Sequence, residues 1–169
     1  VISDPGPQPE REEEISFQYY MFDWDDNILH MPTKIYLERK TPDGWVPHPV
    51  STGQFALIRQ DTENYRPIND DWDDAFEDFY DVGQRGERAF IEDSIAALDP
   101  IVRGETQGGP SFRRFSKALI EGRLFAIITA RAHSSANIRT AVQYFIDNVL
   151  TGGERAEMIA NLRRFRRYF

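Results

Sequence analysis

The sequence predicts an α/β fold, which we expect to be a three-layer sandwich with a mainly parallel sheet and an inserted hairpin and helical cap. Two apolar runs of strand length, at residues 17–22 and 124–128, carry this prediction. Segments with a helical spacing of apolar residues lie between and after these runs. Because strands that alternate with helices form parallel sheets, we expect a ligand site where the two strands end.

Composition sets the limits of this prediction. The 169 residues, 40% hydrophobic and 13% aromatic, are enough for one domain with a real core. The sequence has no cysteine, which excludes disulfides and thiolate chemistry and favours a reducing compartment. No apolar stretch is long enough for a membrane span and the start is not a signal peptide, so we expect a cytoplasmic protein without a membrane partner.

Charge argues against one class of partner. The net charge of -8 argues against nucleic-acid binding, because backbone recognition needs a basic surface. The charge is unevenly distributed: residues 61–99 carry 13 acids against 3 arginines, and residues 103–169 carry 5 acids against 12 basic residues. We interpret this polarity as two parts of the fold that attract each other, although it could also orient an anionic ligand.

The first part of the chain predicts a tail and then strands. Residues 1–14 are rich in Pro and Glu and predict a disordered tail, followed by one domain over 15–169. After the strand at 17–22, "KIYLERK" and "GWVPHPVS" flank the turn sequence "TPDG", which predicts a hairpin. "QFALIRQ" predicts a third strand in the same region.

The second part of the chain is mainly helical in its spacing. From Asn69 onward, aromatic residues and acids fall on opposite faces of a predicted amphipathic helix. Further helices are expected at 89–98, at 111–122 with Ser111 as N-cap and Gly122 as C-terminal stop, and after His133. A last helix runs from residue 151, with Phe169 among its inward residues.

The segment "MFDWDDNIL" places three carboxylates directly after the first strand. Carboxylates this close repel one another, so the arrangement is typical of sites where a cation or a catalytic task compensates the repulsion. Thr129 ends the second strand, so Asp23, Asp25 and Thr129 are expected at one edge of the sheet. The alternative is a strand-to-helix turn in which Asp and Asn cap backbone amides.

"FDWDDNIL" followed by "FAIITAR" resembles the haloacid dehalogenase (HAD) superfamily, most of whose members are phosphatases or other phosphoryl-transfer enzymes. The resemblance implies a Rossmann-like three-layer sandwich, with a cap or flap insertion over about 33–110. It also implies Asp23 as the nucleophile, Asp25 as the general acid and base, Thr129 and Ala130 as phosphate-binding residues, and Mg²⁺ held by Asp23 and Asp25. The implied reaction is hydrolysis of a phosphorylated small molecule through an aspartyl-phosphate.

The sequence departs from the family pattern in three places. Asn27 stands where the family has Thr or Val, no lysine follows Lys117, and no further acid follows an apolar strand after Thr129. Arg139 and Arg155 are the substitutes we considered for the missing lysine. The chain starts at Val1 and stops at Phe169 within a periodic segment, so we expect a C-terminally incomplete fragment whose metal site is half present.

Other interpretations remain open at this point. The domain could be a catalytically degenerate binding or regulatory unit, or the phosphatase part of a nucleic-acid repair enzyme. Strands beyond the first two could come from the hairpin at 34–58, from sequence past Phe169, or from a second copy in a homo-oligomer. "NDDWDD" lacks the Gly and Glu of a calcium loop and predicts a solvated helix start, and His30, His48 and His133 predict surface or packing roles.

Overall fold

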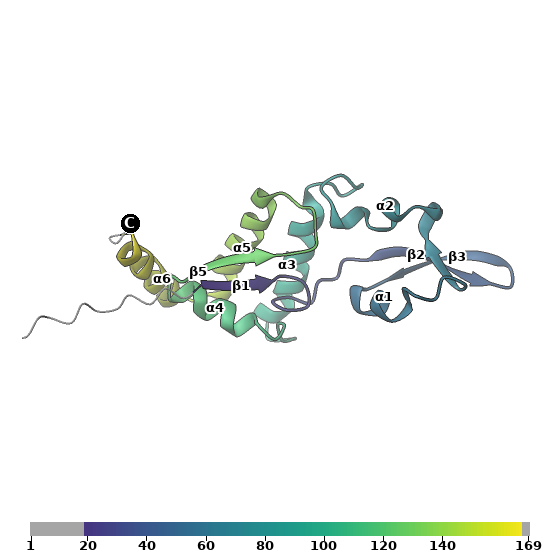
Figure 1. Cartoon of the computed structure of the whole chain (residues 1–169). Coiled ribbons are helices and arrows are strands. Elements are labelled where there is room, and N and C mark those ends of the chain that lie inside the picture. The colour runs from purple at the N-terminus through teal and green to yellow at the C-terminus, as the bar shows by residue number, and fades with distance from the viewer. Residues whose placement is uncertain (1–18, 167–169) are drawn as a thin grey trace, which may run out of the picture.

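The structure is a computed structural model that describes residues 19–166 (Figure 1). The predicted tail at 1–14 and the inward position of Phe169 lie outside the described residues. The elements follow in the order β1 (Tyr19–Asp23), β2 (Ile35–Thr41), β3 (Gly44–Val50), α1 (Thr52–Ile58), β4 (Tyr65–Pro67), η1 (Ile68–Asp70), α2 (Trp72–Ala75), η2 (Glu77–Phe79), α3 (Arg88–Val102), α4 (Phe112–Ile120), β5 (Leu124–Ile128), α5 (Ser135–Val149) and α6 (Gly152–Phe165).

The described strands form two separate sheets, so the predicted three-layer, Rossmann-like sandwich with a mainly parallel sheet is wrong. β1 pairs in parallel with β5, and β2 lies between β3 and β4 in an antiparallel sheet. The reason is local: the turn between β2 and β3 returns the chain onto itself, so these strands pair with sequence neighbours rather than joining β1. Only β1 and β5, among the described strands, meet through a long crossover.

One face of the two-stranded sheet carries the larger core. Phe22 and Trp24 contact Phe115 edge to face, and Phe115 in turn contacts Phe145 of α5. α3, α4 and α5 surround this cluster (Figure 1). We call this part the helical unit, which comprises residues 19–33 and 88–166.

The other face of the same sheet is open among the described residues. Side chains that alternate with the core residues remain exposed: Tyr19 (60%), Met21 (67%), Leu124 (42%) and Ile128 (53%). A parallel sheet normally has both faces covered. The prediction that β1 and β5 are buried strands therefore holds for one face only.

The hairpin module, which comprises residues 35–79, has its own small core. Its buried apolar residues are Ile35, Leu37, Val50 and Ala75. The predicted hairpin is confirmed by the antiparallel pairing from Ile35 with Val50 to Thr41 with Gly44. The predicted third strand "QFALIRQ" is wrong: the segment is helix α1, because Ser51 and Gln54 form a capping box that starts a helix.

The predicted acidic helix from Asn69 is broken into short pieces. Asn69 and Asp70, which lie within the 3-10 helix η1, have positive φ angles of 55° and 63°, so the chain cannot run on from η1 into α2 as one α-helix. Asp71 then caps α2, and its side chain accepts a hydrogen bond from the Asp73 amide. The aromatic spacing still produces a cluster, in which Phe76 contacts rings on both sides, although no continuous helix carries it.

The later helices agree with their predictions apart from their ends. Gly122 has a φ of 62° and terminates α4, as expected, whereas Ser111 occupies the N-cap position without a side-chain bond. α5 begins at a Ser134 cap and α6 at a Thr151 capping box. None of the helices in the described part of the chain is both long and apolar enough to cross a membrane.

Candidate functional site

Asp23 and Thr129 end the two parallel strands and lie at the same edge of the sheet. β1 and β5 are paired so that Asp23 stands opposite Ile128, which places Thr129 one residue beyond the last pair. Asp23, Thr129 and Ala130 line an open depression of about 500 Å³. The structure thus brings together three of the four residues proposed from the sequence, and the fourth, Asp25, lies beside Thr129.

The loop that follows β1 is a tight, hydrogen-bonded turn anchored in the core. Trp24 is fully buried, and its main-chain carbonyl accepts hydrogen bonds from the amides of Ile28 and Leu29. Asp26 has a φ of 57°, the left-handed conformation that Asp tolerates better than most residues. Gly109 packs against this turn so closely that a Cβ there would lie 2.4 Å from the Asn27 carbonyl oxygen. The acidic loop is therefore rigidly placed between the core and the site.

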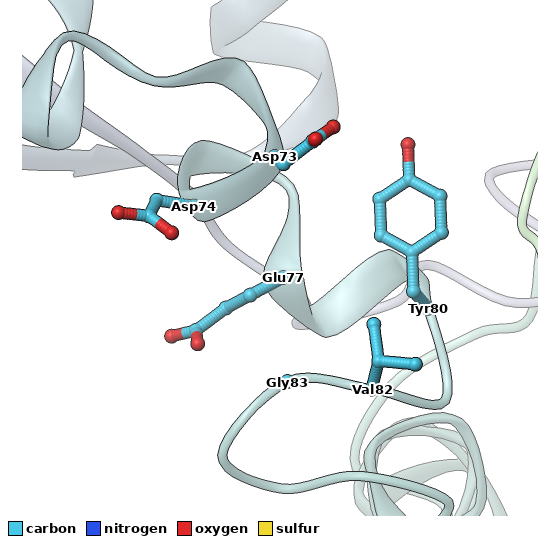
Figure 2. Close-up of a pocket in the computed structure, with 6 residues that line it drawn as sticks. All are labelled: Asp73, Asp74, Glu77, Tyr80, Val82 and Gly83. Carbon is cyan, nitrogen blue, oxygen red and sulfur yellow. The ribbon is translucent and has the colours of Figure 1, made fainter.

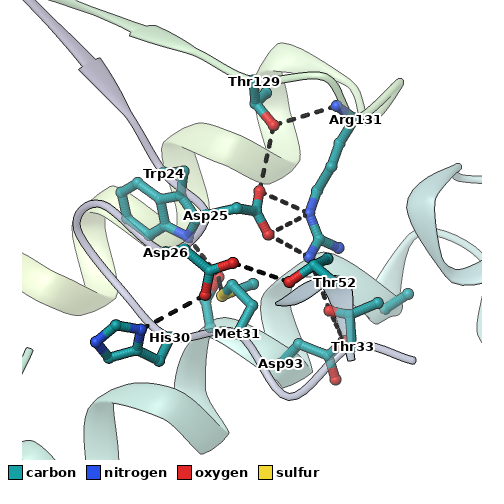
Figure 3. A network of polar contacts seen from close by, with 12 residues as sticks. Trp24, Asp25, Asp26, His30, Met31, Thr33, Thr52, Asp93, Thr129 and Arg131 are labelled. Atoms are coloured by element: carbon teal, nitrogen blue, oxygen red, sulfur yellow. Dashed lines mark hydrogen bonds and ion pairs between the residues drawn. The ribbon is translucent and has the colours of Figure 1, made fainter. Parts of the chain in front are cut away.

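Arg131 is the main site residue that the sequence analysis missed. Figure 3 shows its guanidinium facing the Asp25 carboxylate, with Nε 2.9 Å from both carboxylate oxygens and Nη2 2.5 Å from Oδ1. Thr129 donates from Oγ1 to Asp25 Oδ2 at 3.4 Å and accepts from the Arg131 amide at 3.2 Å. The sequence signal was present in "ITAR", where the arginine stands two residues after the threonine.

The two arginines considered from the sequence do not reach this site. Arg139 is exposed on α5. Arg155 donates from Nη1 to the Asp147 carbonyl oxygen at 2.6 Å, where it binds near the carboxyl end of α5. Among the described residues, neither arginine hydrogen-bonds to Asp23, Asp25 or Thr129, because Arg139 lies on α5 and Arg155 lies on α6.

Electrostatics distinguish Asp23 from Asp25. Burial raises the pKa of Asp23, the nearby Asp25 charge raises it further, and main-chain hydrogen bonds offset part of this shift. In the described part of the chain, Asp25 has a salt-bridge partner and Asp23 has none. Asp23 is thus the carboxylate whose negative charge is left to be compensated by a ligand or an ion.

The donor set fits magnesium in part. Mg²⁺ takes one or two carboxylates and completes its shell with waters and substrate phosphates. The Asp23 carboxylate suits that role, whereas the Asp25 carboxylate is occupied by Arg131, so Asp25 could contribute only its main-chain carbonyl. Within residues 19–166, no group of three or more acidic or histidine side chains could hold a metal ion.

The loop after Thr129 is held by Asp81. Its carboxylate accepts from the ring Nδ1 of His133 at 2.7 Å, from the Ser134 amide at 2.7 Å and from the Asn137 side chain at 3.0 Å. Burial acts to raise the pKa of Asp81, but these hydrogen bonds outweigh it and hold that pKa below its usual value. His133 is buried against Phe90, in keeping with the packing role predicted for it.

An acidic pocket of about 380 Å³ lies on the hairpin side of the molecule (Figure 2). Its carboxylates do not converge, because Asp74 and Glu77 point to one side and Asp73 points to another. Asp73 belongs to the capped start of α2, as the prediction of a solvated helix start requires. This pocket has no geometry for a cation.

No protein-family model matches the chain, and no match was found among curated proteins or solved structures. The resemblance to the HAD superfamily therefore rests on the two segments quoted above, 22–29 and 125–131. Asp23, Asp25, Thr129 and Arg131 are the residues whose geometry bears on the function.

Proposed function

We propose that the protein is a Mg²⁺-dependent phosphohydrolase of the HAD type that acts through an aspartyl-phosphate intermediate. One observation carries this proposal. Asp23, a carboxylate without a salt bridge to any described residue, ends one strand beside an open depression, and a hydroxyl donor, Thr129, follows the parallel strand next to it. This arrangement offers a nucleophile and a phosphate-binding group on the same edge.

In the first step the Asp23 carboxylate oxygen attacks the substrate phosphorus in line, while the bond from phosphorus to the leaving oxygen breaks. Asp25 gives its proton to the leaving oxygen, and the released alcohol departs. Thr129 Oγ1 and the Ala130 main-chain amide donate hydrogen bonds to the phosphoryl oxygens and hold them in place. The product on the protein is an acyl phosphate at Asp23.

In the second step water attacks the phosphorus of this acyl phosphate. Asp25 takes the proton from the water, and the bond between phosphorus and the Asp23 oxygen breaks to release inorganic phosphate. When bound by Asp23 and the main-chain carbonyl of Asp25, Mg²⁺ would neutralise the repulsion between the carboxylate and the phosphate. Burial, and after it the nearby Asp25 charge, raise the pKa of Asp23, and a cation bound there would compensate both effects.

The substrate we propose is a phosphorylated small molecule in the cytoplasm. The open depression has polar groups at one end and the apolar Met21 and Ile128 beside them, so it suits a phosphate with a modest organic group. The lack of cysteine supports a reducing compartment. A homo-oligomer that covers the open sheet face is part of the same proposal.

A second candidate function is a binding or regulatory domain without catalysis. The observation that favours it is the pair between Asp25 and Arg131, because the guanidinium already contacts both oxygens of the carboxylate that would have to reach the substrate. Asn27 and the lack of a lysine after Thr129 point the same way. Such a domain would bind phosphate esters without turning them over.

Hydrolysis of an aryl phosphate with Mg²⁺ separates the two candidates. We expect the wild-type protein to turn over the ester and Asp23→Asn to lose the activity by a factor of roughly 10³ or more, because the nucleophile is gone. The matched control is Asp43→Asn, which makes the same change in the exposed hairpin turn and should leave turnover unchanged. Absence of turnover over a broad panel of phosphate esters, with binding retained, would establish the second candidate.

A further inference from the structure

The boundary between the helical unit and the hairpin module is polar, although it is buried. Thr33, Asp78, Asp93 and Arg131 are each no more than 6% exposed and lie between the two apolar clusters. Buried charges are costly unless they are paired and hydrogen-bonded. The hydrogen bonds and ion pairs among these residues therefore determine how the hairpin module is placed against the helical unit.

The first half of the network leads from the site into α3. Arg131 uses Nη2 twice, since it donates to Asp25 and, at 2.8 Å, to the Thr33 hydroxyl. The Thr33 hydroxyl in turn donates a hydrogen bond to Asp93 Oδ2 (Figure 3). Asp93 thus lies two hydrogen bonds from Arg131's guanidinium, without contact to the depression beside Asp23.

The second half leads from α3 into the hairpin module. Arg85 donates from Nη2 to Asp93 at 2.6 Å and from Nη1 to Asp78 at 3.3 Å. Asp78 also accepts from the hydroxyl of Tyr36 on β2 at 2.8 Å. Burial and the hydrogen bond to Asp78 raise the pKa of Tyr36 to about 12, so its hydroxyl keeps its proton and continues to donate.

Signs alternate along this path, from Asp25 through Arg131, Asp93 and Arg85 to Asp78. Displacing any one charge leaves its neighbours on the path with one partner fewer in a largely buried region, so the members hold or shift together. Two other contacts join the same parts. The Ala132 amide donates to the Phe79 carbonyl at 3.0 Å. Thr52 of α1 donates to Asp26 in the acidic loop at 2.8 Å.

We propose that Asp93 is a positioning residue, which holds Arg131 and thereby fixes the orientation of the Asp25 carboxylate. Because the same Asp93 carboxylate also binds Arg85, the orientation of Asp25 and the seating of the hairpin module are one coupled arrangement. The part of this inference that concerns turnover rests on the proposed phosphohydrolase function. The coupling itself rests on the contacts alone.

The test is Asp93→Asn in the whole chain, read by the NMR signal of the Arg131 Nε–H group, which is assigned by its loss in Arg131→Lys. We expect the signal to shift and its exchange with water to accelerate roughly tenfold, since a hydrogen bond to a charged group is lost. Asp99→Asn is the matched control, because Asp99 lies on the same helix and accepts from Tyr144 at 2.7 Å. It should leave the Arg131 signal where it was.

Turnover provides the second readout. Asp93→Asn should lower kcat for an aryl phosphate roughly tenfold and change KM by less than about twofold, because Asp25 is misplaced while phosphate binding at Thr129 is intact. If the wild-type protein has no turnover, the proposed function fails and the NMR signal still decides the coupling. An unchanged Arg131 signal in Asp93→Asn, or a raised KM at constant kcat, would overturn the proposal.

A milder variant covers the case in which Asp93→Asn does not fold. Tyr36→Phe removes only the hydroxyl that donates to Asp78, on the module side of the network. It should shift the Arg131 Nε–H signal, whereas Tyr65→Phe in the same module should not. The Tyr65 ring contacts His48, and its hydroxyl has no hydrogen bond among the described residues. Equal spectra for the two variants would contradict the coupling.

Discussion

The helical unit and the hairpin module are stabilised in different ways. The helical unit buries many large aromatic and aliphatic side chains, including Trp24, Phe90, Phe115 and Phe145. The hairpin module buries four smaller ones and leaves its larger aromatics partly exposed. Between the units lies Arg85, which pairs with Asp93 of the helical unit and with Asp78 of the hairpin module.

This difference indicates a division of roles. The large core holds the loop after β1 and the end of β5 in fixed positions, as the proposed site would require. The small core makes the hairpin module a weaker unit, which depends on the polar boundary for its placement. The candidate site lies at the point where the rigid part meets that boundary.

The largest expected effect is a difference in unfolding free energy between equivalent substitutions in the two cores. Leu98→Ala in the helical unit should cost about 3–5 kcal/mol of unfolding free energy, because a fully buried side chain leaves a cavity in a dense core. Leu37→Ala is the same change at a buried position in the hairpin module and should cost only about 2 kcal/mol, since a small core can collapse around the loss. Urea unfolding of both variants measures the difference. Equal costs would contradict the distinction between the units.

The next largest loss of unfolding free energy is expected at the polar boundary between the two units. Arg131→Met should cost about 3 kcal/mol, because it leaves Asp25 and Thr33 without their shared donor in a buried region. Arg66→Met is the control: its pair with Glu38 at 2.7 Å lies on the partly exposed face of the hairpin module, and its loss should cost about 1 kcal/mol or less. Thermal and urea unfolding compare the two variants. A smaller loss in Arg131→Met than in Arg66→Met would show that the boundary contributes little.

The smallest effect depends on pH. The pKa of Asp81 is lower in the folded protein than in the unfolded chain. Ionised Asp81 therefore stabilises the fold fully at pH values above its pKa in the unfolded chain, and this stabilisation disappears as the pH falls through its pKa in the folded protein. Asp81→Asn should therefore cost about 1 kcal/mol at neutral pH. The gap to wild type should close below pH 3.8, the ordinary value for this group. A gap that is constant across this range would mean that the charge of Asp81 does not hold the loop after Thr129.

Local features of the sequence predicted much of the fold. The hairpin, both parallel strands and four helices follow from apolar spacing and from turn and cap residues such as Gly122, because these signals act within a few positions. The prediction of a third strand at 54–60 was wrong because its apolar residues fit both the spacing of a strand and that of a helix. The capping box at Ser51 starts a helix there. The sheet arrangement could not be read from spacing, since strand pairing depends on contacts between distant segments.

The candidate site was predicted in part for the same reason. Asp23 and Thr129 follow strands, so their meeting at one edge could be expected once the strands were placed. Arg131 could not be assigned, because its role depends on how the loop after β5 folds back onto Asp25 and onto the ring of Phe79, 4.4 Å from the guanidinium carbon. The network through Thr33 and Asp93 joins residues 60 positions apart, which no local pattern reveals.

The most direct test of the central claim is the mass of the intact protein after reaction with a phosphate ester and Mg²⁺ followed by rapid acid quenching. We predict that the wild-type protein gains the mass of one phosphoryl group, that peptide mapping places it on Asp23, and that Asp23→Asn gains none. Turnover without any phosphorylated protein, or a phosphoryl group that persists in Asp23→Asn, would contradict the assignment of Asp23 as the nucleophile.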